Sequence, residues 1–270
     1  SGRLFTMNFN RRLEPVYLKL KNLIASGESG RIRRIQWTST DWFRTDAYYA
    51  SAPWRGTWSG ESGGVLLNQC VHILDLWQSI FRMPDRVTGF CRFGKYHDIE
   101  VEDEATAVME YKAGITGSFI ASSGESPGTN RIELACDNGR IVVQDKKIIF
   151  NKTRIPLSKF NRTCENAFSE PEIWNSEIPI SGQTDVSSNI LRNFVEAIQG
   201  KTHLLVDGKE GLKSQMLANA ILLSSWTGET VRLPFDEVRY KEILDTKSRT
   251  VKINKPQNSG KVFDLSESFK

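Results

Sequence analysis

The feature that most constrains the fold is a series of short, strand-like segments with very short connections between residues 87 and 152. β-Branched, aromatic and alternating apolar residues mark the segments 87–95, 104–111, 115–123, 131–136, 140–143 and 147–152. The sequence Asp137-Asn138-Gly139 is typical of a tight turn between two of them. Parallel strands need crossovers of about a dozen residues or more, so these connections predict a largely antiparallel sheet.

Helical patterns lie on both sides of this sheet-forming region. Before it, Pro15 begins a segment whose apolar residues recur at helical spacing up to Gly27. After it, apolar residues recur at helical spacing in 186–198 and 212–221, and a short helix is expected at 235–244. Residues 3–10 and 31–43 look extended, whereas 153–185 are polar and are expected to be irregular.

These patterns predict the α+β fold class. We expect an open, predominantly antiparallel β-sheet with helices packed on one face. Residues 1–247 are expected to form one domain, and the Lys- and Ser-rich residues 248–270 a polar C-terminal arm.

Composition excludes several functional classes. The chain has 39% hydrophobic and 25% charged residues, which is typical of a globular protein. Its net charge is only +4 and its basic residues are dispersed, so we predict no nucleic-acid partner. No apolar run reaches the roughly 18 residues that span a membrane, and residues 1–7 lack the charged region and apolar core of a signal peptide. The four cysteines form no Cys-x-x-Cys pair, which favours a cytoplasmic location without structural zinc.

The segment 63–81 carries the most specific polar pattern. A glycine pair opens an apolar run of helical length, in which Asn68, His72 and Asp75 are spaced i, i+4 and i+7 and would share one helix face. His72 could act as a general acid–base, with Asp75 fixing its tautomer and Asn68 contacting the same ligand. A buried histidine satisfied by a neighbour would show the same pattern, and periodicity does not separate the two interpretations.

The preceding loop, 44–62, contains arginine and aromatic side chains among small residues. Guanidinium groups and aromatic faces suit a polyhydroxylated or anionic ligand. Aromatic residues that fold back over the core would give the same composition. By residue type and position, the candidate substrate contacts are Arg11, Arg44, Tyr48, Trp54, Arg55 and Tyr96.

Motifs for cofactors and metals are missing from the sequence. No Gly-x-Gly-x-x-Gly lies between a strand and a helix, so we predict no dinucleotide site within this chain. The glycines at 60–64 are more typical of a tight turn than of a phosphate-binding loop. The acidic run after His97 lacks the spacing of metal ligands and is expected to be a solvated loop.

Several segments resemble, in the correct order, the landmarks of a known domain. Asn10-Arg11-Arg12-Leu13-Glu14-Pro15, residues 27–32 and the Gly-Gly…His…Asp segment 63–76 are similar to the C-terminal domain of the glucose–fructose oxidoreductase/inositol dehydrogenase (Gfo/Idh/MocA) family. Residues 193–198, 208–212 and 231–234 resemble its closing helices and last strand. The resemblance extends over most of the chain, and the segment around His72 is its specific part.

The resemblance implies an oxidoreductase that uses NAD or NADP on a hydroxyl of a sugar, cyclitol or related polyol. It implies a dihydrodipicolinate-reductase-like C-terminal domain that forms a homodimer or homotetramer through its sheet. His72 matches the family's catalytic acid–base, which takes the hydroxyl proton as hydride leaves. Asn68 stands where many members have an assisting aspartate; an amide cannot take a proton, so Asn68 would orient substrate. Asp75 matches a mainly structural position.

The family's N-terminal Rossmann domain and its Glu-Lys-Pro lysine have no counterpart in these residues. We therefore expect the chain alone to hold no NAD(P) and to be inactive as a fragment of a longer enzyme. One alternative is a non-catalytic sugar-binding or assembly module, because sugar-sensing regulators contain the same domain. Another is a relative that cleaves glycosides through a transient, NAD-dependent oxidation. A nucleotide fingerprint upstream would distinguish the dehydrogenase from the module.

Overall fold

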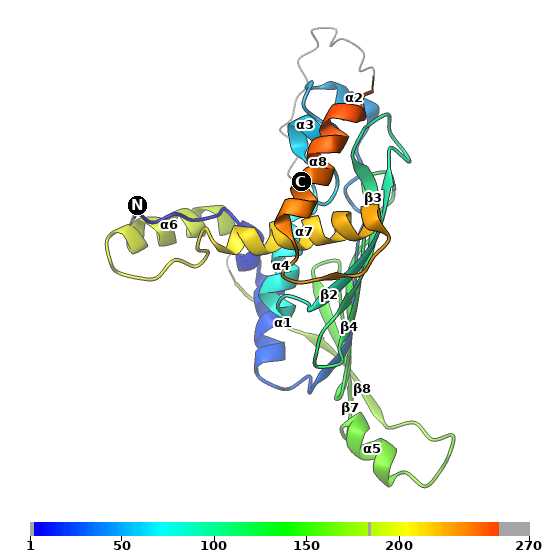
Figure 1. Cartoon of the computed structure of the whole chain (residues 1–270). Helices are drawn as coiled ribbons and strands as arrows, with labels where there is room; N and C mark the ends of the chain where they lie inside the picture. The colour runs from blue at the N-terminus through cyan, green and yellow to red at the C-terminus, as the bar shows by residue number, and fades with distance from the viewer. Residues whose placement is uncertain (1–2, 183–184, 254–270) are drawn as a thin grey trace.

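The structure, a computed structural model, describes residues 3–182 and 185–253 of the 270-residue chain. Its central feature is an open sheet in which nine strands occur in the order β8-β7-β6-β5-β1-β4-β3-β2-β9 within the described residues (Figure 1). The strands are β1 (Ile32–Ser39), β2 (Arg86–Phe93), β3 (Glu102–Glu110), β4 (Thr116–Ser122), β5 (Asn130–Cys136), β6 (Gly139–Gln144), β7 (Lys147–Thr153), β8 (Ile173–Ile178) and β9 (Val231–Arg232).

Seven of the eight neighbouring strand pairs in this order are antiparallel, and only β1 and β4 run parallel. The predicted open, predominantly antiparallel sheet is therefore confirmed. The meander is interrupted, however, because β1 inserts between β4 and β5: Trp37 pairs with Phe119 on one side and with Ile132 on the other. Local spacing in 87–152 could not reveal a strand contributed from earlier in the chain.

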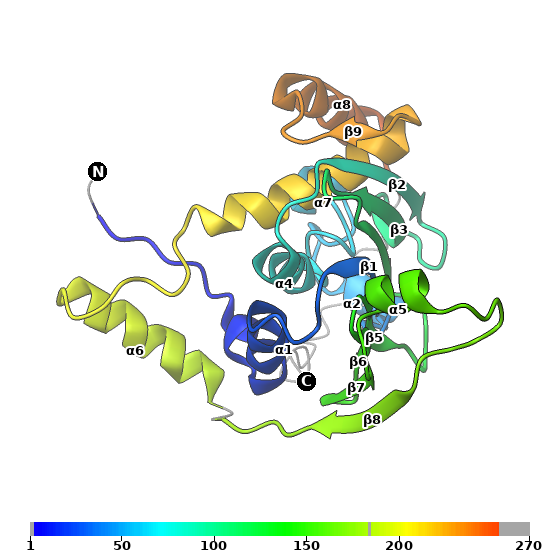
Figure 2. The ribbon, with the colours of Figure 1, turned by 90° about the horizontal axis from the view of Figure 1, so that it is seen from below.

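Helices cover one face of the sheet, as predicted, with α1, α4 and α7 packed side by side on it (Figure 2). The helices are η1 (Asn10–Leu13, a 3-10 helix), α1 (Pro15–Ala25), α2 (Asp46–Ala50), α3 (Trp58–Glu61), α4 (Val71–Phe81), α5 (Leu157–Thr163), α6 (Val186–Ile198), α7 (Glu210–Thr227) and α8 (Glu237–Thr250). None of the helices in the described ranges combines the length and the apolar character needed to cross a lipid bilayer.

Aromatic packing fixes α4 on the sheet. The indole rings of Trp37 on β1 and Trp77 on α4 are stacked with centroids 6.4 Å apart, and Phe119 on β4 meets Trp77 edge-on at 6.0 Å. All three side chains are fully buried. A Cβ at Gly117 would lie 2.6 Å from the Trp77 ring, so only glycine allows this approach. Burial of side chains this large holds α4, and with it His72, in a fixed position over β1 and β4.

Several local expectations were wrong. Residues 3–10 are not a strand; Thr6 alone forms an isolated bridge with Asp207. The segment 153–185 contains α5 and β8, and the loop 44–62 contains α2 and α3. In α6 the apolar residues Leu191, Val195 and Ile198 are exposed, while Ile190 packs with Phe9 and Val206 in a small separate cluster. That helix lies beside the N-terminal segment (Figure 1).

Helix α8 runs through the expected domain end at residue 247 and ends at Thr250. Asp236 caps its start by accepting from the amides of Val238 and Arg239. Most of the expected polar arm, residues 254–270, lies outside the described residues. The division at 247 stays a prediction.

Candidate active site

His72 lies in the first turn of α4, which begins at Val71 rather than near Gly63. The residues before it form turns. In these turns the backbone N–H of Asn68 donates to the Gly64 carbonyl at 2.9 Å, and the backbone N–H of Cys70 donates to the Val65 carbonyl at 2.8 Å. Asn68 is therefore not on the helix. The expected helix face with Asn68, His72 and Asp75 in line was wrong.

Glu102 on β3 explains why the helix starts late. The Val65 amide donates to its carbonyl at 2.9 Å and the Leu66 amide to its carboxyl at 3.0 Å, so this turn is hydrogen-bonded to the sheet. A Cβ on Gly64 would come within 2.0 Å of the Glu102 carbonyl oxygen, so this position requires glycine. Burial raises the pKa of Glu102 to about 7, although the backbone amides of Gly64 and Leu66 oppose the change.

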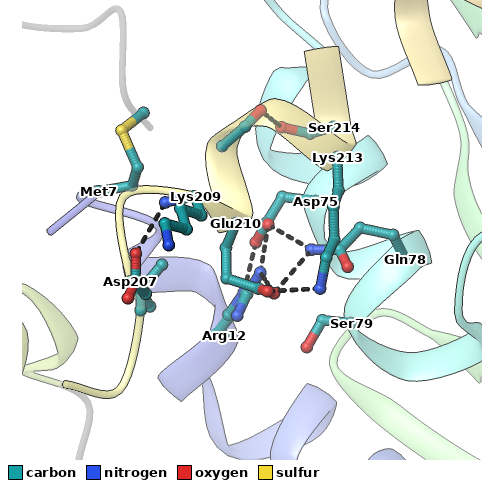
Figure 3. Close-up of polar contacts among 12 residues, drawn as sticks. Met7, Arg12, Asp75, Gln78, Ser79, Asp207, Lys209, Glu210, Lys213 and Ser214 are labelled. Carbon is teal, nitrogen blue, oxygen red and sulfur yellow. Dashed lines mark hydrogen bonds and ion pairs between the residues drawn. The ribbon is translucent and has the colours of Figure 1, made fainter. Parts of the chain in front are cut away.

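Asp75 belongs to a buried ion-pair cluster and does not hydrogen-bond His72 (Figure 3). Arg12 donates to both of its carboxylate oxygens, at 2.7 and 2.6 Å, and also contacts Glu210 at 3.1 Å. Gln78 donates to Asp75 at 3.0 Å. The cluster joins η1, α4 and α7. Asp75 therefore cannot fix the His72 tautomer by a direct hydrogen bond, and its position is structural.

The His72 ring is half-buried, and its environment favours the neutral form. Its Nδ1 atom is buried without a hydrogen-bond partner among the described residues. The ring meets Phe9 edge-on at 5.6 Å. Burial and the positive charge of Arg11 lower the His72 pKa, and Asp75 only partly opposes them. A neutral imidazole with an unsatisfied nitrogen can accept a proton, whereas a core histidine satisfied by its neighbours would have both nitrogens paired.

Three of the predicted substrate contacts form a row of guanidinium groups, which we call the arginine row: Arg11, Arg44 and Arg55. Aromatic rings stand between them. The distances from guanidinium carbon to ring centroid are Arg11–Trp42 4.9 Å, Arg44–Trp42 5.8 Å, Arg44–Tyr48 5.2 Å, Arg55–Tyr48 4.2 Å and Arg55–Trp54 4.5 Å. Each shared ring brings two arginines together, so η1 and the loop after β1 build one cationic, aromatic surface.

The backbone of Arg44 is held from both sides. Its amide donates to the Ser123 carbonyl at 2.9 Å, and its carbonyl lies 2.8 Å from Nε2 of His97. Nδ1 of His97 lies 3.2 Å from the buried Asp103 carboxylate. Both ring nitrogens thus face acceptors, an arrangement that favours the imidazolium form. Burial opposes that charge, but the hydrogen bonds to Asp103 and to the Arg44 carbonyl outweigh it and raise the His97 pKa.

The acidic run after His97 is therefore not the solvated loop that we expected. Glu100, Glu102 and Asp103 are buried, because each carboxylate accepts hydrogen bonds from backbone amides. Within the described ranges, no group of three or more histidine, cysteine or acidic side chains is arranged to hold a metal ion.

Asn68 connects the turn before α4 to the loop. The side-chain nitrogen Nδ2 of Asn68 donates to the Glu61 carboxylate at 2.5 Å, and its side-chain oxygen Oδ1 accepts from the Tyr48 hydroxyl at 3.4 Å. Arg55 and Gln69 also donate to the Tyr48 oxygen. Asn68 thus links the Glu61 carboxylate to the Tyr48 hydroxyl.

The remaining aromatic candidates differ in placement. Trp54 is 46% exposed beside the arginine row, but Tyr49 and Trp58 in the same loop are buried, so part of the loop does fold back over the core. The Tyr96 hydroxyl donates to Glu104 at 2.7 Å, and no contact in the described part of the chain links Tyr96 to the arginine row. We do not place Tyr96 in the site.

Sequence reasoning missed Trp42, Glu61 and His97. Trp42 lies three residues after the end of β1 and two before Arg44, so its position near a strand end was an available signal. No local pattern indicated Glu61 or His97, since their partners Asn68 and Arg44 become neighbours only in the fold.

Residues 17–142 match the family model described as the GFO/IDH/MocA C-terminal domain. Over these residues the chain is similar to the C-terminal domain of this family. The matched residues run from α1 to β6 and include His72, Asn68 and the loop at 44–62. A comparison with curated protein sequences finds no match.

Solved structures share the fold of this chain. The WlbA dehydrogenase from Bordetella pertussis, in complex with NADH and UDP-GlcNAcA, is 23% identical with a TM-score of 0.68 over 87% of this chain and 64% of that one. Levoglucosan dehydrogenase, in complex with NADH and levoglucosan, is 17% identical with a TM-score of 0.67, covering 86% and 67%. The aldose-aldose oxidoreductase from Caulobacter crescentus, complexed with glycerol, is 16% identical with a TM-score of 0.67, covering 86% and 64%.

The chain thus spans less than two thirds of the length of the first of these proteins. The glycines that could have formed a phosphate loop are filled by protein: a Cβ on Gly60 would lie 2.3 Å from the Trp54 carbonyl oxygen, and one on Gly64 would meet Glu102.

Proposed function

We propose that this chain is the substrate-binding and oligomerisation domain of an NAD(P)-dependent oxidoreductase that acts on a hydroxyl of a sugar, cyclitol or related polyol. The observation that carries the proposal is His72: a neutral imidazole with an unpaired buried nitrogen, beside the arginine row, in a chain similar to the GFO/IDH/MocA C-terminal domain. NAD or NADP would be held by a part of the enzyme outside the described residues.

In this proposal His72 accepts the proton of the substrate hydroxyl during oxidation and returns it during reduction. The lowered pKa keeps the ring neutral at physiological pH, as a base requires. Asn68, Tyr48 and Gln69 present amide and hydroxyl groups that orient sugar hydroxyls. Asp75 and Arg12 act indirectly, by holding α4 against η1.

The proposed assembly is a homodimer or homotetramer formed through the open face of the sheet. That face exposes Phe90 on β2, which is 60% exposed, and Val108 on β3. Three of the four cysteines are buried free thiols, which is consistent with our proposal of a cytoplasmic location.

Steady-state assays of two proteins test this function: the 270-residue chain, and the product of the complete reading frame that contains it. Each is incubated with NAD or NADP and a panel of sugars and cyclitols. We expect nicotinamide reduction only by a protein that also contains a nucleotide-binding domain. Turnover by the 270-residue chain alone would contradict the proposal.

Asn68 favours one second candidate, a non-catalytic sugar-binding module, because an amide stands where a proton-accepting carboxylate would assist His72. If the product of the complete reading frame binds sugar and shows no hydride transfer with either cofactor, the module is the correct reading.

A further inference from the structure

We propose that the site takes an acidic sugar, one that carries a carboxylate or a phosphate, and that the arginine row binds this negative group. The inference rests on the proposed function, because it assigns the substrate class of that site. It follows from the charge and hydrogen bonding of the arginine row.

Arg44 has binding capacity that the fold does not use. Its Nε atom is buried without a partner among the described residues, and its Nη1 donates to the Phe43 carbonyl at 2.9 Å. No described carboxylate forms an ion pair with it. A buried guanidinium donor without an acceptor costs free energy unless a ligand supplies one. A carboxylate or phosphate oxygen is the acceptor that pairs best with a guanidinium group.

The charge of Arg11 is only loosely paired. Its ion pair with Glu14 is long, at 3.8 Å. The positive charge of Arg11 reaches His72, because it lowers the His72 pKa. An anion bound at the row would screen Arg11 from His72.

The surroundings suit a sugar rather than a free inorganic ion. Trp54 offers an exposed ring next to Arg55, and sugar rings stack on such faces. Tyr48, Asn68 and Gln69 supply hydroxyl and amide groups beside the same guanidinium groups. A ligand with hydroxyls and one negative group therefore uses both sets of contacts.

Titrations of the 270-residue chain with D-glucose, D-glucuronate, D-glucose 6-phosphate and inorganic phosphate test the inference. Calorimetry gives the affinities, and NMR of the histidine ring protons gives the His72 pKa. We expect glucuronate or glucose 6-phosphate to bind at least about tenfold more tightly than glucose, and to raise the His72 pKa. Whichever acid binds more tightly identifies the carboxylate or the phosphate as the recognised group. Arg44→Gln should remove this preference, whereas Arg162→Gln on the distant, exposed α5 should keep it.

The contrary results are separable. Equal affinities for glucose and both acids, or an unchanged preference in Arg44→Gln, would overturn the acidic-sugar inference and leave the proposed function standing. Inorganic phosphate that binds as tightly as glucose 6-phosphate would also overturn it, by showing a general anion patch. If no sugar binds at any concentration up to tens of millimolar, the proposed function fails with it.

Discussion

At the residue scale, the carboxylate of Asp75 shows how a candidate catalytic group can instead be structural. Two parallel hydrogen bonds from Arg12 occupy both oxygens, and the side chain is completely buried. Sequence spacing correctly placed Asp75 and His72 on one helix. The spacing could not show that Arg12, 63 residues earlier, forms an ion pair with the Asp75 carboxylate.

Asp75→Asn should lower the free energy of unfolding by about 3 kcal/mol, because it leaves the largely buried Arg12 with only Glu210 as a charged partner. Urea denaturation of the 270-residue chain measures the change. A double-mutant cycle with Arg12→Met should show strong coupling between the two positions. A loss below about 0.5 kcal/mol would show that the pair does not hold α4.

His97 should make the stability pH-dependent above neutrality. The His97 pKa is raised in the folded state. The free energy that the protonated ring contributes to folding is therefore fully present below pH 6.5, and it is lost as pH rises through the folded pKa. His97→Gln keeps a hydrogen-bond donor without the charge and should flatten the decline above about pH 6.5. His203→Gln, an exposed control, should keep it. If stability declines equally in His97→Gln and in the unmodified protein, His97 is not a charged ring that donates hydrogen bonds from both nitrogens.

Glu102 should make the stability pH-dependent over a lower pH range than His97 does. Its folded pKa of about 7 lies above the ordinary value of 4.5, so the folded state binds the proton more tightly. Stability should therefore fall as pH rises from about 4.5 to 7. In Glu102→Gln, which resembles the protonated form, this part of the decline should disappear while the part due to His97 remains. Thermal unfolding across pH 4.5–8 measures both; an undiminished decline in Glu102→Gln would contradict the assignment.

At the element scale, apolar periodicity found the main helices and the starts of α1 and α6, but it misplaced the start of α4. Residues 63–70 are as apolar as α4, and a buried turn and a buried helix look alike in such a pattern. Glu102 decides that residues 63–70 form a turn, because its carboxyl accepts a hydrogen bond from the backbone amide of Leu66, 36 residues earlier in the sequence. The strands were recognised because their signals are local, whereas the insertion of β1 between β4 and β5 depends on distant pairing.

Two adjacent glycines test this account of the turn. Gly64→Ala should destabilise the protein by more than about 2 kcal/mol, because its Cβ would overlap the rigid backbone of Glu102. Gly63→Ala is the matched control: its Cβ would meet only the flexible Leu67 side chain, so the loss should be smaller. Denaturation midpoints compare the two. Equal losses would mean that the turn can move away from β3.

At the scale of the whole molecule, the candidate site joins segments that are far apart in sequence. Residue type and position selected Arg11, Arg44, Tyr48, Trp54 and Arg55, and their contacts form one surface. Tyr96 was selected by the same criterion and lies elsewhere, with its hydroxyl on Glu104. Composition indicates which groups a site could use, but the order of the strands decides which of them meet.

The most direct test of the central claim is the turnover of the complete enzyme with His72→Gln. We predict that kcat falls by at least about 100-fold while the dissociation constant for NAD(P)H changes less than twofold, because the residue moves a proton and does not hold the cofactor. In the unmodified enzyme, kcat/KM should decline only below about pH 6.5, where His72 begins to be protonated. His203→Gln should leave kcat unchanged. A kcat for His72→Gln within a few-fold of the unmodified enzyme would contradict the account.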